Sequence, residues 1–402
     1  MNKVLDQNLI RYLIGTCLFR GLFTQSIIII YFLSLGYSNA KISLLFAIYG
    51  IAVIASQIPS GYLADKYSRH IIFSFWGIFV FLGTLLPIIN TSFISLCFAE
   101  GLCGLAVGFG SGKETAYLHD YLSVKGHKNA YSTIYSKQLV LENYMYAIAS
   151  FVGGYLASID IFIPFYITIG SMVIGTLFVI SLSACKPKYR IAKVSLAFKC
   201  CYFNSLQNKR LFSYMALSFL ICGGLSFCYW QFQPFVEMAN VSTKYLGFIY
   251  LLIHVAMAFY SKLIPSLLRR FTIKRILLFH VGIFYFQLFL LSNLSNLPSI
   301  FVITLIFAAS YNFRSFLNIA INETVTSTQR AMYLSVAGTL EYVGYIVYFL
   351  MNSIIVEQLT FQHSLLVICV ISLFLLILGY FYIRKRKVTI NIIDPIAAQD
   401  AT

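Results

Sequence analysis

Five charged side chains stand inside long apolar stretches of this sequence: Arg20, Glu100, Glu142, Arg314 and Glu341. An ionised group that faces lipid would cost about 2.5–3.5 kcal/mol, so such groups turn inward, pair with one another or titrate. One interpretation is a set of structural Arg–Glu pairs, in which the acids stay ionised. The other is an internal cavity whose acids bind and release protons. We expect Glu142, Glu341 and Glu100 to be the candidates for proton coupling.

Polar residues at helical spacing predict a substrate cavity around these charges. Two stripes of such residues contain the two arginines, and an aromatic segment at the end of a later apolar run fits either binding or an interfacial belt. His254 fits a hydrogen-bonded packing role as well as a proton carrier. The candidate cavity residues are Arg20, Thr24 and Tyr31 on the first stripe, Tyr311, Arg314 and Asn318 on the second, and Trp230 and Gln231 in the aromatic segment.

The composition requires that these residues be positioned by membrane helices. The chain has 402 residues, of which 59% are hydrophobic and only 10% are charged, and its mean hydropathy is +0.82. Soluble domains carry about 25% charged residues. The long continuous runs also argue against a β-barrel, whose strands alternate. Twelve apolar runs predict twelve transmembrane helices, at 9–34, 42–62, 71–89, 92–118, 131–157, 161–184, 211–234, 245–264, 276–293, 299–322, 331–355 and 362–383.

The distribution of basic residues predicts the orientation and the domains. With the N-terminus inside, the inner segments hold 21 Lys and Arg residues and the outer loops hold only Lys41 and Lys244, so both termini should be cytoplasmic. The net charge of +16 therefore indicates inner loops and not nucleic-acid binding. The longest polar connection is basic and should lie against anionic headgroups, although a regulatory partner site is an alternative. The expected parts are a six-helix bundle at 1–184, the linker 185–210, a second bundle at 211–383 and a tail at 384–402.

The two bundles are expected to be repeats. Segments 61–70 and 261–270 each follow the second apolar run of their half, and both carry Leu and Arg at matching positions. Glu142 and Glu341 stand in corresponding runs, 199 positions apart. Repeated halves with a binding site between them are typical of secondary transporters. The predicted fold is thus an all-α membrane protein with twelve helices in two six-helix repeats.

The segment PSGYLADKYSRH at 59–70 resembles the loop signature of the major facilitator superfamily, G-x-L-a-D-[RK]-x-G-[RK]-[RK]. Ser68 and His70 depart from that pattern. The resemblance implies a latch in which Asp65 faces the start of the eleventh helix and Arg69 meets an acid of the fourth helix. We expect that acid to be Glu114 first and Asp120 second. The residues implied for the latch are Gly61, Asp65, Lys66, Arg69, Glu114 and Asp120.

The fourth run is similar to a branch of the superfamily that contains drug and small-molecule exporters. The similarity rests on Gly112, Glu114, Ala116 and Asp120, and on a Q-R-A-x-x-L-S pattern at 329–335. Glu100 stands where many exporters have an arginine. As residues of one helix, Glu100 and Glu114 would share a face about 20 Å apart.

We therefore predict a proton-coupled secondary transporter that exports small amphipathic compounds such as antibiotics. Glu142 is the preferred proton carrier, because Lys137 lies more than a helical turn away and no acid neighbours it in sequence. The alternatives are an uptake permease for a small metabolite and a membrane receptor or scaffold without transport. No P-loop motif is present, and no Cys or His spacing suits zinc. The expected partners are a small molecule, protons and the lipid bilayer of the cell membrane. The expected protein is a monomer that binds no nucleic acid, cofactor or metal and is not an enzyme.

Overall fold

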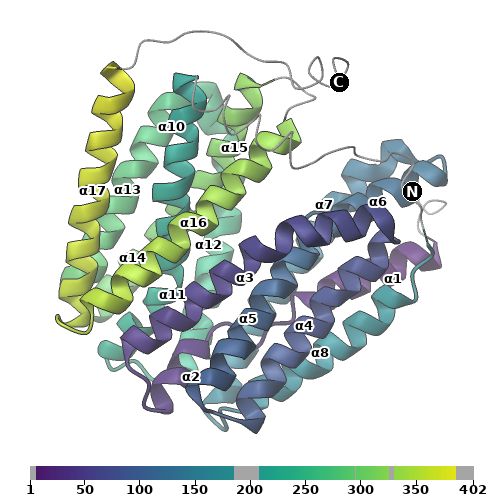
Figure 1. Ribbon diagram of the computed structural model, residues 1–402, viewed down its shortest axis with the longest axis horizontal. Coiled ribbons are helices and arrows are strands. Elements are labelled where there is room, and N and C mark those ends of the chain that lie inside the picture. The colour runs from purple at the N-terminus through teal and green to yellow at the C-terminus, as the bar shows by residue number, and fades with distance from the viewer. Residues whose placement is uncertain (1–5, 185–207, 295, 326–329, 386–402) are drawn as a thin grey trace. The chain divides into compact units, whose positions relative to one another are not determined.

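The computed structural model describes residues 6–184, 208–294, 296–325 and 330–385. The regular secondary structure of these residues is entirely helical (Figure 1). Most of the expected linker 185–210 and tail 384–402 lies outside the described residues. The chain divides into two compact units. The first is Met1–Arg190 with Val236–Val255, and the second is Ile191–Phe235 with Ala256–Thr402.

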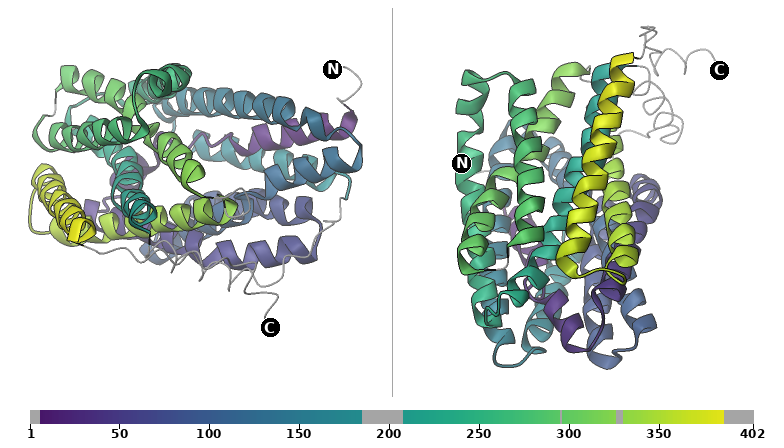
Figure 2. Two further views of the ribbon diagram at one scale, coloured as in Figure 1. Left: turned by 90° about the horizontal axis from the view of Figure 1, so that it is seen from above. Right: turned by 90° about the vertical axis from the view of Figure 1, so that its left-hand side faces the viewer.

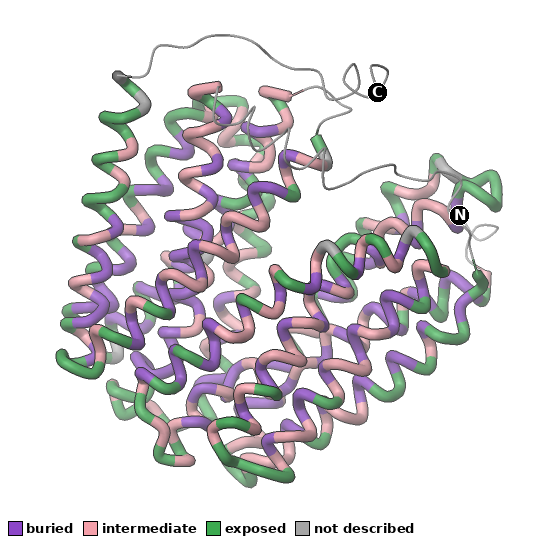
Figure 3. Tube along the Cα trace, in the orientation of Figure 1, coloured by how far each residue is buried: buried purple, intermediate pink, exposed green. Residues whose placement is uncertain are grey.

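In the first unit, helix α4 (Arg69–Ile89) is the central helix of a row and has a neighbour on each side. In Figure 1, α4 lies between α5 and α8, α3 lies beside α5 and α1 lies beside α8. The buried face of each helix turns toward these neighbours (Figure 3). Its helices are α1 (Gln7–Phe19), α2 (Ile28–Ser34), α3 (Asn39–Lys66), α4 (Arg69–Ile89), α5 (Phe93–Gly110), α6 (Lys113–Val124), the short η1 (Lys128–Ala130), α7 (Tyr131–Ala157) and α8 (Ile163–Ile180).

Small residues allow these helices to approach closely. A Cβ atom at Gly104 of α5 would lie 2.3 Å from the carbonyl oxygen of Tyr49 and 2.8 Å from the Cβ of Ala52, both on α3. Such a contact leaves no room for a side chain, and it is typical of helix pairs in membranes. The α3–α5 pair is therefore fixed by backbone contact as well as by side-chain packing.

The first predicted run, 9–34, is not one helix. It ends as α1 at Phe19 and resumes as α2 at Ile28, with Arg20 as the C-cap of α1. Side chains of α8 satisfy backbone groups that the break releases. Ser171 donates from Oγ to the carbonyl of Leu18 at 2.7 Å, and the amide of Phe23 donates to Thr168 Oγ1 at 3.0 Å. Broken backbone is tolerated at membrane depth when neighbouring helices supply such partners.

The fourth run is also interrupted. Helix α5 ends at Gly110, and α6 begins at Lys113 after Gly112, whose φ is +76°. Left-handed backbone of this kind suits glycine and is costly for other residues. The expectation that Glu100 and Glu114 share one face of one helix is therefore wrong, because they lie on two helices with a break between them.

The second unit shows interruptions of the same kind. Helices α10 and α11 are joined by the π-helical turn η2, and α14 passes into α15 at Asn312. Helices α13 and α17 lie side by side in it (Figures 1 and 2). The helices that run into or through this unit are α10 (Lys209–Leu217), η2 (Ser218–Cys222), α11 (Gly223–Met238), α12 (Thr243–Arg270), α13 (Ile273–Asn293), α14 (Leu297–Tyr311), α15 (Phe313–Thr324), α16 (Arg330–Ile355) and α17 (Phe361–Lys385).

Ten helical stretches of the described chain are long and apolar enough to cross a membrane. They correspond to ten of the twelve predicted runs. The other two runs are helical but differ from the rest: α1 has only 13 residues because of the break after Phe19, and the first half of α7 is rich in polar residues. The chain is thus a multi-pass helical protein.

Candidate functional site

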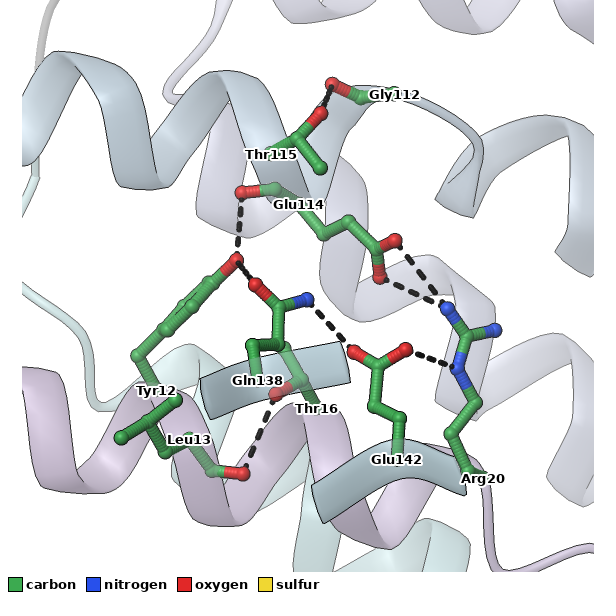
Figure 4. A network of polar contacts seen from close by, with 9 residues as sticks. All are labelled: Tyr12, Leu13, Thr16, Arg20, Gly112, Glu114, Thr115, Gln138 and Glu142. Atoms are coloured by element: carbon green, nitrogen blue, oxygen red, sulfur yellow. Dashed lines mark hydrogen bonds and ion pairs between the residues drawn. The ribbon is translucent and has the colours of Figure 1, made fainter. Parts of the chain in front are cut away.

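A buried ion network surrounds Arg20 in the first unit (Figure 4). Arg20 Nε donates to Glu142 Oε2 at 2.9 Å. Its Nη2 lies 3.2 Å from Glu114 Oε1 and 3.3 Å from Oε2. The three residues come from the break after α1, the second position of α6, and α7. The two helix breaks thus bring one cation and two carboxylates together.

Neutral side chains complete this network (Figure 4). Gln138 Nε2 donates to Glu142 Oε1 at 2.6 Å. The hydroxyl of Tyr12 lies 2.8 Å from Gln138 Oε1 and 3.0 Å from the carbonyl oxygen of Glu114. Glu142 therefore accepts hydrogen bonds at both of its oxygens, whereas the Glu114 carboxylate receives only the longer contacts from Arg20.

Two aromatic rings flank the guanidinium group. Arg20 Cζ lies 4.3 Å from the ring centre of Trp76 and 5.8 Å from that of Tyr146. These distances permit cation–π attraction, which is strongest for tryptophan. His254 stacks on Tyr146 with 6.1 Å between ring centres, and no hydrogen-bond partner for its Nε2 is found among the described residues.

The network holds one more acid than it holds cations. With Glu114 and Glu142 both ionised and Arg20 protonated, its net charge is −1. Arg20 alone can neutralise only one of the two carboxylates. Chemically, the arrangement can take up one proton and become neutral.

The second unit contains a balanced counterpart. Arg314 of α15 forms an ion pair with Glu341 of α16, and Ser226 Oγ donates to Glu341 Oε1 at 3.2 Å. Arg314 Cζ lies 5.9 Å from the ring centre of Tyr311. The side chain of Glu341 is 8% exposed, whereas that of Arg314 is 46% exposed. One cation faces one acid here, so the pair is neutral without a proton.

The loop residues after α3 are only partly brought together. Arg69 Nη1 lies 2.8 Å from Asp120 Oδ2, whereas Glu114 binds Arg20. In this structure Arg69 therefore pairs with Asp120, the second of its two expected partners, and not with Glu114. Glu114 and Asp120 are six residues apart and lie on different faces of α6, so they reach different helices.

The remaining latch residues make fewer contacts. A Cβ atom at Gly61 would find no atom of the described structure within 4 Å, so no described helix packs closely against this glycine. Lys66 is exposed. The side chain of Asp65 lies outside the described residues.

Glu100 stands apart from the Arg20 network. It is 8% exposed on α5, and Cys97 and Cys103 are near enough to feel its charge. No ion pair to Glu100 occurs in the described part of the chain.

The predicted cavity residues fall into three groups. Arg20 and Arg314 lie in the two ion networks. Tyr31 does not share a face with Arg20, because the break separates them; it is 1% exposed, and its hydroxyl donates to the carbonyl of Pro87 at 2.7 Å. Thr24 lies in the turn between α1 and α2, and Gln231 is buried. The half-buried candidates are Trp230, Tyr311 and Asn318.

Sequence reasoning missed several members of the first network, although a signal for them exists. Gln138 and Tyr146 stand one helical turn before and after Glu142, and Tyr12 stands two turns before Arg20. Residues at these spacings share a helix face. Lys113, at the start of α6, is also buried.

Outside the ten candidate membrane spans, Asp6 caps α1 and joins it to the end of α6. Its carboxylate accepts hydrogen bonds from the hydroxyl of Tyr121 and the amide of Leu9, with Lys125 3.8 Å away. Burial alone would raise the pKa of Asp6, but these partners together hold it below its usual value.

The described residues contain no group of three or more His, Cys, Asp or Glu side chains that could hold a metal ion.

Comparisons with known proteins agree on the fold. The Major Facilitator Superfamily model matches residues 12–321, and by sequence none of the curated proteins matches. Among solved structures, a point mutant of the nucleoside transporter NupG is 15% identical with a TM-score of 0.77, covering 93% of this chain and 98% of that one. A bacterial homologue of the iron transporter ferroportin, in the inward-facing state, is 14% identical with a TM-score of 0.69. The match covers 94% of this chain and 99% of that one. An autoinhibited POT family peptide transporter is 11% identical with a TM-score of 0.73 (96% and 98% covered).

Proposed function

Because the chain belongs to the major facilitator superfamily, we propose that it is a proton-coupled secondary transporter that exports small amphipathic compounds. As a member of this family it is a multi-pass membrane transporter and not an enzyme. Coupling, substrate and direction are the parts that we propose.

The observation that carries the proposal is the shared arginine of the first unit. Glu114 and Glu142 both contact Arg20, so a proton on one of them removes the excess charge. We assign the proton to Glu114, although the sequence favoured Glu142. Glu142 keeps short hydrogen bonds from Arg20 and Gln138, and protonation would weaken both, whereas Glu114 would give up only contacts longer than 3 Å. Glu100 is the second candidate.

Glu341 has a different proposed role. Its ion pair with Arg314 holds one cation and one acid, so we assign Glu341 to holding Arg314 in place. The exposed part of Arg314, together with the half-buried Tyr311, Asn318 and Trp230, then offers a cation, polar groups and aromatic faces to a substrate. This mixture suits a compound with both apolar and polar parts.

Alternating access is supported by the interrupted helices. The first, fourth, seventh and tenth predicted runs are all broken or distorted, at 20–27, 111–112, 218–222 and 312. Discontinuous helices of this kind form the binding sites of many transporters. We propose twelve spans in two six-helix repeats, with both termini on the cytoplasmic side of the cell membrane and the monomer as the working unit.

The ion pair between Arg69 and Asp120 is the proposed latch. It joins the start of α4 to the cytoplasmic part of the fourth run. Both side chains are about four-fifths buried, so water or other polar groups must replace this contact when the pair opens. A latch that closes in one conformation only would set the rate of the transport cycle.

Export is favoured over uptake by the motifs shared with exporters, Gly112 to Asp120 and 329–335. Residues 326–329 lie outside the described residues, so this argument rests on the sequence. The solved structures support the fold alone, and their substrates do not decide the substrate of this chain. An uptake permease and a non-transporting receptor or scaffold remain the alternatives.

The decisive test is transport by the purified protein in liposomes with an imposed pH gradient. Dyes, antibiotics, nucleosides and small peptides make up the compound panel, and Glu114→Gln is the matched variant. The proposal expects accumulation that is driven by the gradient in the wild type and lost in the variant. Gradient-driven movement in the opposite direction would establish the permease. Absence of both gradient-driven transport and counterflow exchange across the panel would favour the receptor or scaffold.

A further inference from the structure

A lysine is buried at the break in the fourth run. Lys113 opens α6 and is only 9% exposed. Its Nζ donates to Ser60 Oγ of α3 and to the carbonyl of Gly108 of α5, both at 2.7 Å. Ser60 Oγ also lies 2.8 Å from the same carbonyl oxygen. The ammonium group thus ties three helices together through one cluster of contacts.

Packing alone does not explain a lysine at this buried position, because burying its ammonium group costs free energy. No acid pairs with Lys113 among the described residues, and an unpaired charge at membrane depth is costly. Charge-assisted hydrogen bonds recover part of that cost. An apolar or hydroxyl side chain would fill the same space without it, so the cation calls for a functional explanation.

The residues that follow Lys113 provide one. Glu114, the next residue, reaches Arg20, and Asp120 near the other end of α6 reaches Arg69. Helix α6 has 12 residues and starts at the left-handed Gly112. A single short helix therefore carries contacts to α3 and α5, to Arg20 and to α4, and its start is fixed by Lys113.

We propose that Lys113 is a positioning residue for the proton site: it pins the start of α6 so that Glu114 reaches Arg20. When Glu114 takes up a proton and releases Arg20, α6 can turn about Gly112 and withdraw Lys113 from Ser60. The same movement would act on Asp120 and hence on the latch. This inference rests on the proposed function, because it assigns the proton to Glu114.

The other groups that Glu114 faces are known from the structure. Glu114 contacts the guanidinium group of Arg20, and Glu142 contacts the same group. Three tyrosines of the neighbouring helices lie near enough to feel the charge of Glu114: Tyr12, Tyr131 and Tyr135. Loss of the Lys113 pin should loosen the contact with Arg20, so that Glu114 binds its proton at higher pH.

Tryptophan fluorescence can follow this event without transport. The chain has two tryptophans, and Trp76 lies 4.3 Å from the Arg20 guanidinium. In a Trp230→Phe background, a pH titration of the fluorescence of the full chain therefore reports on the Arg20 network. Glu114→Gln should abolish the transition, which identifies the titrating group.

Two variants and two matched controls test the pin. Lys113→Met should move the midpoint by about one pH unit to higher pH, and Ser60→Ala should move it in the same direction by less. Lys137→Met removes a lysine of α7 outside the network, and Ser56→Ala removes a buried hydroxyl one turn away on α3 that bonds only to Val53 in the described structure. Both controls should keep the wild-type midpoint.

The outcomes separate this inference from the proposed function. A midpoint that is unchanged in both Lys113→Met and Ser60→Ala, or a transition that survives Glu114→Gln, overturns the role of Lys113. A wild type that titrates as described but shows no transport driven by a pH gradient overturns the proposed function. It does not affect the positioning role of Lys113.

Discussion

Glu114 and Arg314 are 200 positions apart, and each is the second residue of a helix that follows a break. Glu114 follows the break at Gly112, and Arg314 follows the break at Asn312. Each then forms an ion pair inside its own unit, Glu114 with Arg20 and Arg314 with Glu341. These two positions thus carry opposite charges, in agreement with our proposal that the first unit binds the proton and the second contributes to the substrate site.

The two acids of the first network should respond differently to neutralisation. Glu114→Gln should keep counterflow exchange of substrate but lose accumulation driven by a pH gradient, because the group that titrates is gone. Glu142→Gln should impair both activities, since it removes the carboxylate that makes the shorter of the two ion-pair contacts with Arg20. Both activities are measured on the same liposomes. Uphill transport that survives in Glu114→Gln and is lost only in Glu142→Gln would return the proton to Glu142.

The latch can be tested by charge reversal. Arg69→Ala and Asp120→Asn should each lower the transport rate about tenfold or more, and each should also lower the thermal stability by about 1–3 kcal/mol, because the pair is largely buried. Arg69→Glu combined with Asp120→Arg should restore part of the rate. Wild-type rates in both single variants would remove this pair from the mechanism.

The balanced pair of the second unit should contribute to stability. Arg314→Met leaves Glu341 buried without its cation, which should cost on the order of 3 kcal/mol and lower the melting temperature in detergent by several degrees. Adding Glu341→Gln should recover part of that loss. Arg275→Met, at an exposed position of α13, is the control and should melt like the wild type; an equal loss in the control would contradict a specific role for the pair.

Close backbone packing predicts a contrast between two glycines. Gly104→Ala places a methyl group 2.3 Å from the Tyr49 carbonyl oxygen, so α3 and α5 must separate, at a cost of about 1–3 kcal/mol. Gly170→Ala adds a methyl group to α8 where no described atom lies within 4 Å, and it should be neutral or slightly stabilising. Thermal melting of the two variants is the measurement, and equal melting temperatures would refute the argument.

Much of the helical plan could be predicted because lipid allows few alternatives. Long apolar runs must form helices, and most of the predicted runs begin and end close to observed helices or helix pairs. The breaks were not predicted. Glycine at 112 gave a hint, but the break after Phe19 depends on Ser171 and Thr168, which lie about 150 positions away in the sequence.

The site could be predicted in kind but not in detail. The cost of charge in lipid selected five side chains, of which Arg20, Glu142, Arg314 and Glu341 form ion pairs. Glu100, the fifth, forms none among the described residues. The partners could not be assigned, because a break changes the direction of every residue after it. For that reason the sequence led us to expect Glu114 as the partner of Arg69 and Tyr31 on the same helix face as Arg20.

The π-helical turn at 218–222 affects the register of its run. A π turn accommodates one residue more than an α turn, and one residue corresponds to a rotation of about 100°. Its altered backbone is held by Tyr348, whose hydroxyl donates to the carbonyl of Leu220 at 2.9 Å, and by Ser218, which donates to the carbonyl of Ala337 at 2.6 Å. Deleting one residue from this turn would restore a regular helix and rotate all of α11, including Trp230, by about 100° relative to α10. In this part of the chain, a change of length would therefore do more harm than most changes of residue type.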